Sequence, residues 1–169
     1  LLTLTDEKGK KTFEEYVKPI TFGAQQTLLY KRWVKRNQDY AEKYSGGKIG
    51  YVHVEAMDSK SFRSVYSDVL GKYRNRQALV DERHNGGGWL HNDLGILLSG
   101  KLFQTYQSRG QNIGNDPYMR WCRPSCVLVC EDCYSNANGF PLMYKALGIG
   151  KLVGMPMAGT MTAVWWEMQ

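Results

Sequence analysis

The sequence lacks the long apolar segments and nucleotide-binding signatures that mark several common protein classes. No apolar run approaches the length of a membrane span, and no signal peptide is visible. The patterns G-x-x-x-x-G-K-[ST] and G-x-G-x-x-G are absent, which argues against a phosphate-binding or dinucleotide-binding loop. The G-x-S-x-G pattern of a nucleophile elbow is absent too. The chain begins at Leu1 rather than methionine, so we expect a fragment or a processed product.

The composition is that of an ordinary globular domain. The 169 residues suffice for one domain with a hydrophobic core, and hydrophobic residues make up 43% of them. The formal net charge of +6 would suit a nucleic-acid partner. Much of it lies in Lys8–Lys11 and Lys31–Arg36, and the second cluster falls on an amphipathic helical pattern, where basic residues usually face solvent. Because no nucleic-acid-binding motif accompanies these residues, we expect no nucleic-acid partner.

The few cysteines give little support for a metal site. Cys130 and Cys133 have the C-x-x-C spacing of a zinc knuckle or a redox pair. A zinc site usually needs two more ligands at similar spacing, and the sequence shows none. Cys126 and Cys130 are four apart on an apolar run, so both are expected to point inward as small apolar side chains. We therefore expect no metal and no cofactor.

Strand-like and helical patterns alternate through most of the chain. Residues 1–21 read as a hairpin, and 24–44 as a helix. Short β-branched runs then alternate with helical stripes, which predicts an α/β fold with a mostly parallel sheet. The expected strands are Lys48–Val54, Ala78–Asp81, Cys126–Cys130 and Lys151–Met155, and Cys126–Cys130 is expected to be buried on both faces. One helix is expected after a cap at Asp58 or Ser59, a second over Leu90–Leu102, and a third over Phe140–Leu147. The polar stretch 110–124 is expected to be irregular.

A serine stands at the corner between the third of these strands and its helix. Ser135 to Gly139 is small and polar, so the corner exposes the Ser135 hydroxyl. The amide of Asn136 lies at the helix N-terminus, pointing where an oxyanion could form. The alternative is that Ser135 or Asn136 simply caps the helix, because both residue types are favoured at that position.

A second candidate is the run of glycines that follows the strand ending at Asp81. Gly86, Gly87 and Gly88 let the backbone turn freely and approach a ligand without obstruction by Cβ atoms. Their amides could supply a second oxyanion donor opposite Asn136. A plain strand-to-helix turn is the alternative.

The joint order of these stretches resembles the tail-specific (C-terminal processing) serine peptidases, in particular their tricorn-like branch. The stretches that carry the resemblance are Tyr30–Val34, Ile49–Val54, Asp81–Gly88, Ser135 in its corner, and Gly148–Gly154. The resemblance implies a ClpP/crotonase-like spiral of ββα units with a mostly parallel sheet. It also implies that residues 1–22 end a PDZ-like domain and that 23–169 form a catalytic core truncated at both ends.

The resemblance implies a serine peptidase with an acyl-enzyme on Ser135. The oxyanion would be held by the amides of Asn136 and one loop glycine, with Gly87 the first choice, while Gly86 and Gly88 would contact substrate. Many members use a lysine base downstream of the serine, but the corresponding stretch 158–160 has none, and Lys151 is expected to face outward.

The missing lysine favours the tricorn arrangement, in which an upstream domain supplies a histidine. His84 and His91 flank the glycine loop, but neither matches the family's base, and His53 is expected to be a packed or solvent-facing strand residue. This chain alone is therefore expected to be inactive. The implied partner is a peptide or unfolded-protein substrate.

Two other functions and two further questions stay open. A degenerate relative could bind peptides without cleaving them, and a crotonase-type acyl-CoA enzyme could use the same amides for an enolate without needing Ser135. The polar stretch 110–124 is expected to line a substrate groove or to form a subunit contact, which leaves homo-oligomerisation open. Four cysteines without clear pairing fit either redox compartment, and the resemblance leans to an exported protein.

Overall fold

The computed structural model describes residues 1–161 and divides the chain into two compact units, up to Lys35 and from Arg36 onward. The first unit begins with the antiparallel hairpin of β1 (Leu2–Thr5) and β2 (Thr12–Glu15). Both strands are exposed along their length. The hairpin predicted for residues 1–21 is therefore present, and its assignment to a PDZ-like domain stays a prediction. Helix α1 (Phe22–Ser45) follows and crosses the boundary between the units.

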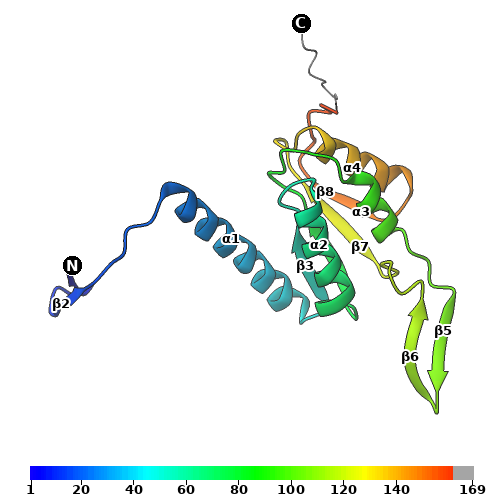
Figure 1. The fold of residues 1–169 in the computed structure, drawn as a ribbon, viewed down its shortest axis with the longest axis horizontal. Helices are drawn as coiled ribbons and strands as arrows, with labels where there is room; N and C mark the ends of the chain where they lie inside the picture. Colours follow the sequence, from blue (N-terminus) through cyan, green and yellow to red (C-terminus); the bar gives the residue numbers. More distant parts are fainter. Residues whose placement is uncertain (162–169) are drawn as a thin grey trace, which may run out of the picture. The chain divides into compact units, whose positions relative to one another are not determined.

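The second unit is built on a four-stranded sheet in which every strand runs parallel to its neighbours. The strands lie in the spatial order β3 (Ile49–His53), β4 (Gln77–Asp81), β7 (Ser125–Val129) and β8 (Lys151–Gly154). The connection from β3 to β4 contains α2 (Ser59–Ser67) and a turn of π-helix, η1 (Asp68–Lys72). The connection from β4 to β7 contains α3 (His91–Leu98), and that from β7 to β8 contains α4 (Asn136–Ala146) (Figure 1). Strands added in chain order by right-handed crossovers put all three helices on one face of the sheet.

That helix-covered face holds the hydrophobic core. Val52, Val80 and Val127 sit in register across three strands, and each is at most 2% exposed. Leu94 of α3 and Phe140 of α4 complete the same fully buried cluster. Burying such side chains stabilises the fold by roughly 1.5–3 kcal/mol each.

The opposite face of the sheet is only half covered. Leu79, Cys126 and Leu128 alternate with the core residues and are each partly exposed. The prediction that strand 126–130 is buried on both faces is therefore wrong, and so is the inward placement of Cys126. The reason is that strand alternation sends Cys126 to the face opposite α2, α3 and α4, whereas Cys130 lies beyond the end of β7 and is buried there.

Two further segments differ from the sequence-based expectation. The helix expected over 90–102 ends at Leu98, and Gly100 then packs so closely on the Trp121 carbonyl that a Cβ would lie 2.7 Å from its oxygen. The stretch 110–124, expected to be irregular, begins inside an exposed hairpin of β5 (Gln104–Ser108) and β6 (Gln111–Asp116). Arg109 and Gly110 both have positive φ, as a tight two-residue hairpin turn requires. The hairpin was missed because its strands are polar on both sides.

Of the two residues expected to cap α2, Asp58 is the one that does so: its Oδ1 accepts a hydrogen bond from the amide of Ser61 at 2.7 Å.

Among the described residues, every helix is too short or too polar to cross a lipid bilayer.

Candidate active site

Ser135 occupies a strained corner between β7 and α4. Its backbone has φ 52° and ψ −121°, a conformation that non-glycine residues rarely adopt and that costs about 1–3 kcal/mol. Although Ser135 stands at the N-cap position, its side chain makes no capping hydrogen bond. The alternative that Ser135 caps α4 is therefore wrong. Its hydroxyl has no hydrogen-bond partner among the described residues.

The side chain of Asn136 caps a different helix from the one it begins. Its Oδ1 accepts from the amide of Leu90, the N-cap residue of α3, at 2.8 Å and from that of His91, the first residue of α3, at 3.0 Å. Its own backbone N–H belongs to the first turn of α4 and meets no acceptor within the described part of the chain. This amide is available to an anion placed beside Ser135.

Gly87 brings the glycine loop into contact with this corner. A Cβ at Gly87 would lie 2.7 Å from the Cβ of Ser135 and 3.3 Å from the amide nitrogen of Asn136, and φ is +99°. Only glycine fits such an approach. The N–H of Gly87 donates to Asn85 Oδ1 at 2.8 Å, which fixes the orientation of this peptide unit.

The two neighbouring glycines have different surroundings. Gly88 forms a parallel bridge with Met57, and a Cβ there would meet the Met57 carbonyl oxygen at 2.3 Å. Gly86 is surrounded by open space within 4 Å of where a Cβ would stand. The structure therefore places the predicted residues Ser135, Asn136 and Gly87 together, with Gly86 and Gly88 on either side of the contact.

Asn85 is a site residue that sequence reasoning missed. It is fully buried, its Nδ2 donates to the Val54 carbonyl at 2.8 Å, and its own carbonyl accepts from the Tyr134 amide at 3.0 Å. It thereby joins the end of β3 to two loops, the glycine loop (82–90, between β4 and α3) and the serine loop (130–135, between β7 and α4). An asparagine beside glycines signals only a turn, so its two long-range hydrogen bonds, to Val54 and Tyr134, had no sequence signature.

Two buried carboxyl groups lie at the start of the glycine loop. Asp81 is bound by Arg83, with Nη2 to Oδ2 at 2.6 Å, and accepts from the Tyr51 hydroxyl at 2.6 Å. Burial and the nearby Asp81 raise the pKa of Tyr51 far above its ordinary value, so this hydroxyl stays protonated. Glu82 is fully buried, and both carboxylate oxygens lack a hydrogen-bond partner among the described residues. Burial, with a smaller effect of Asp81, raises the pKa of Glu82 to about 9, so Glu82 is neutral near pH 7.

The three histidines are all engaged away from the Ser135 hydroxyl. His53 Nε2 contacts the Arg83 carbonyl at 3.0 Å, and burial lowers the pKa of its ring. His91 Nδ1 accepts from Asn136 Nδ2 at 2.7 Å, and His84 Nδ1 lies 2.8 Å from Asp132 Oδ2. Within the described residues, no histidine is hydrogen-bonded to Ser135.

The cysteines near the corner are poor nucleophiles. Burial, reinforced by a hydrogen bond to Asp132, raises the pKa of Cys130 to about 12. Burial likewise raises the pKa of Cys133 above its ordinary value. Both thiols are therefore protonated near neutral pH, and protonated thiols react slowly.

Comparison with known proteins gives one consistent family. Residues 48–169 match the model of peptidase family S41. The chain is 27% identical over 154 residues to the putative tricorn-like protease C-terminal subunit of Sulfurisphaera tokodaii, covering 89% of this chain and 17% of that protein. It is 27% identical over 153 residues to the tricorn protease homolog of Saccharolobus solfataricus, covering 88% of this chain and 14% of that protein.

The fold agrees with this family. The crystal structure of the tricorn protease superposes with a TM-score of 0.73 and 25% sequence identity, covering 83% of this chain and 14% of that one. The predicted α/β fold of ClpP/crotonase type with a mostly parallel sheet is thereby confirmed, as is the resemblance to the tricorn-like branch. The chain spans only about a sixth of the length of these curated relatives. With the family model matching most of its residues, the chain belongs to peptidase family S41.

Proposed function

We propose that the intact protein hydrolyses peptide bonds by acyl transfer, with Ser135 as the nucleophile. The observation that carries this proposal is the strained backbone of Ser135, which presents a hydroxyl without a capping bond at the N-terminus of α4 and against Gly87. A strand-to-helix corner of this kind is how hydrolases expose a nucleophilic serine, even where the G-x-S-x-G motif is missing. The substrate is a peptide or an unfolded protein segment, in keeping with the protease names of the relatives.

The proposed chemistry follows from the groups around the corner. Ser135 Oγ attacks the scissile carbonyl carbon as a base removes its proton, and the carbonyl oxygen becomes an oxyanion. The N–H groups of Asn136 and Gly87 donate to that oxyanion. Collapse of the intermediate expels the amine, which takes up the proton, and water then releases the acyl group from Ser135.

To donate a hydrogen bond to the oxyanion, the Gly87 N–H must share its proton with a second acceptor. It already donates to Asn85 Oδ1, so the oxyanion would make a three-centre hydrogen bond with it or displace the asparagine oxygen. The amide of Asn136 needs no such exchange. Losing one oxyanion donor typically lowers kcat by about 10²–10³-fold.

We further propose that the base is a histidine from another segment of the intact protein. This is supported by the engagement of His53, His84 and His91 with groups other than the Ser135 hydroxyl. The 169-residue chain on its own is then inactive, because a serine hydroxyl without a base is a weak nucleophile.

Fluorophosphonate labelling of the full-length protein tests the proposal. We expect labelling of the parent and of Ser108→Ala, an exposed serine on β5. Ser135→Ala should abolish labelling while the fold, followed by circular dichroism, is unchanged. Failure of the folded full-length parent to label would overturn the peptidase proposal in favour of a non-catalytic peptide binder or a crotonase-type enzyme, neither of which needs an activated Ser135.

A further inference from the structure

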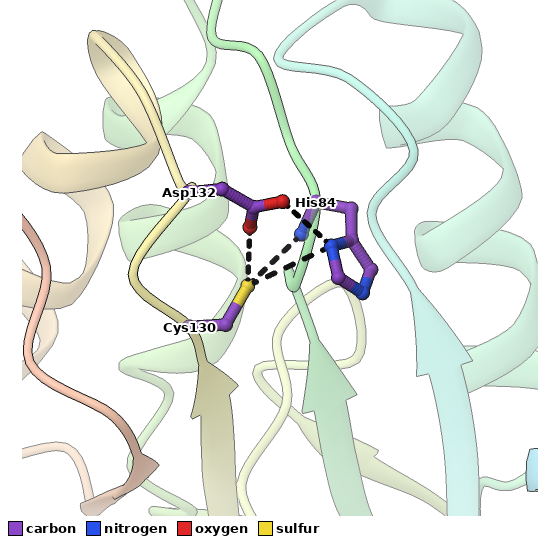
Figure 2. Close-up of side chains that lie close together, drawn as sticks. All are labelled: His84, Cys130 and Asp132. Atoms are coloured by element: carbon purple, nitrogen blue, oxygen red, sulfur yellow. Dashed lines mark hydrogen bonds and ion pairs between the residues drawn. The ribbon is translucent and has the colours of Figure 1, made fainter.

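Three potential metal-binding side chains converge beside the serine loop. Figure 2 shows His84, from the loop after β4, facing Cys130 and Asp132, from the loop after β7. One ligand atom from each of the three lies within 4.8 Å of the other two. His84 and Cys130 are 46 residues apart in the chain, so only the fold brings them together.

A fourth donor stands next to this cluster. The Sγ atoms of Cys130 and Cys133 are 3.8 Å apart, and Cys130 Sγ is 4.0 Å from His84 Nδ1. Around a tetrahedral Zn²⁺, with bonds of about 2.3 Å to sulfur and about 2.0–2.2 Å to nitrogen or oxygen, ligand atoms lie about 3.4–3.8 Å apart. The Cys130–Cys133 and Cys130–His84 separations are close to that spacing. Cys133 lies outside the set of three residues whose ligand atoms are all within 4.8 Å of one another, and its Sγ donates to the Glu82 carbonyl at 3.3 Å, so its side chain must turn towards the ion.

Asp132 must also adjust. Its Oδ1 accepts from Cys130 Sγ at 2.7 Å, and its Oδ2 lies 2.8 Å from His84 Nδ1. These contacts are shorter than ligand separations around a metal ion, so the carboxylate would draw back slightly. Its side chain is 57% exposed and that of His84 is 61% exposed, so both can move and the ion has a path from solvent.

We propose that His84, Cys130, Asp132 and Cys133 form a binding site for one divalent ion of the Zn²⁺ type. Thiolate and imidazole ligands favour zinc over Mg²⁺ or Ca²⁺, which prefer oxygen. Binding replaces each thiol proton with the metal and releases it to solvent. The backbone N–H of His84, which donates to Cys130 Sγ at 3.2 Å, supports the sulfur from the second coordination shell.

The site would fasten the two loops that carry the proposed active site. His84 stands three residues before Gly87, and Cys133 stands two residues before Ser135. An ion held by both loops would therefore hold the glycine loop and the serine loop together. This consequence for activity rests on the proposed function, whereas the metal site itself does not.

Titration of the reduced full chain with Co²⁺ tests the site without measuring activity. We expect one Co²⁺ per chain with a thiolate-to-cobalt charge-transfer band and the intense visible bands of tetrahedral Co²⁺. Zn²⁺ should displace it, and excess Mg²⁺ should not. Absence of these bands at saturating Co²⁺, or binding that Mg²⁺ displaces, would overturn the proposal.

Matched variants identify the ligands. Cys130→Ser should weaken binding and remove the share of the charge-transfer band that this thiolate contributes, and His84→Asn should weaken binding at least about tenfold. Asparagine tolerates the left-handed backbone of residue 84 (φ 66°), and the side chain is exposed, so this variant should fold even if Cys130→Ser does not. Cys126→Ser, on β7 outside the cluster, should bind as the parent does. Unchanged binding in His84→Asn, or equal loss in Cys126→Ser, would contradict the assignment.

Discussion

At the scale of single residues, the candidate active site depends on two backbone conformations that side chains normally avoid. Ser135 has φ 52° although it has a side chain, and Gly87 has φ +99° where a side chain would collide with Ser135. The strain at Ser135 is sustained by the buried helix that follows, since Asn136, Ala137 and Phe140 are all at most 1% exposed. Such strain points to a functional site because folding alone does not require it.

Gly87→Ala should lower the reactivity of Ser135, whereas Gly86→Ala should leave that reactivity unchanged, because the role expected for Gly86 is contact with the peptide substrate. The new Cβ at residue 87 would collide with Ser135 and sit at an unfavourable φ, so we expect a loss of about 1–3 kcal/mol of stability. Fluorophosphonate labelling of the full-length protein should fall at least tenfold, the size of a modest loss of oxyanion stabilisation. Gly86 has open space for a Cβ and no positive φ, so it is the matched control. Equal labelling of the two variants would show that close approach at residue 87 is unimportant.

At the scale of elements, α3 depends on a residue outside its own sequence for its N-terminus. The residue at its N-cap position, Leu90, makes no side-chain capping bond. Asn136 from the next crossover accepts the two amides instead. The start of α3 and the start of α4 are therefore tied together at the same edge of the sheet, beside Ser135.

Asn136→Ala should destabilise the protein by about 1–2 kcal/mol, because the Leu90 and His91 amides lose their acceptor. Hydrogen exchange at these two amides should accelerate more than exchange elsewhere in α3. Asn136→Asp keeps an oxygen at the Oδ1 position and serves as the control. If the alanine and aspartate variants exchange alike, the long-range cap does not stabilise α3.

At the scale of the whole molecule, the buried carboxyl of Glu82 makes stability depend on pH. In the unfolded chain this group ionises above its ordinary value of 4.5, whereas in the folded chain it stays protonated up to about pH 9. Because folding raises its pKa, Glu82 makes its full contribution to the free energy of unfolding below pH 4.5. That contribution decreases as the pH rises from 4.5 to about 9. The slope within that window approaches about 1.4 kcal/mol per pH unit.

Glu82→Gln should remove this component, because an amide does not ionise. We compare the free energy of unfolding of the variant with that of the parent. The variant-minus-parent difference should increase by about 1 kcal/mol or more for each pH unit between about pH 5 and about pH 8. Urea unfolding of both proteins across this range is the measurement. A difference that stays constant with pH would mean that Glu82 is ionised in the folded state or well solvated.

The sequence by itself determined the order and type of the main elements. Alternating β-branched runs and helical stripes indicate βαβ units, and the glycines and the serine corner stand where the strands end. These patterns are local, since burial of one face repeats every two or every 3.6 residues along the chain. The polar strands β5 and β6 lack such a pattern and were missed for that reason.

Only the tertiary structure decided which of these residues touch. Parallel crossovers bring the carboxyl ends of β4 and β7 to one edge of the sheet, so Gly87 lies against Ser135 and His84 lies beside Cys130. The same packing buries Glu82 without a partner in the described chain and turns the Asn136 side chain towards α3. Residues more than forty positions apart leave no periodic trace in a single sequence, because their contact is set by strand order and register rather than by local conformation.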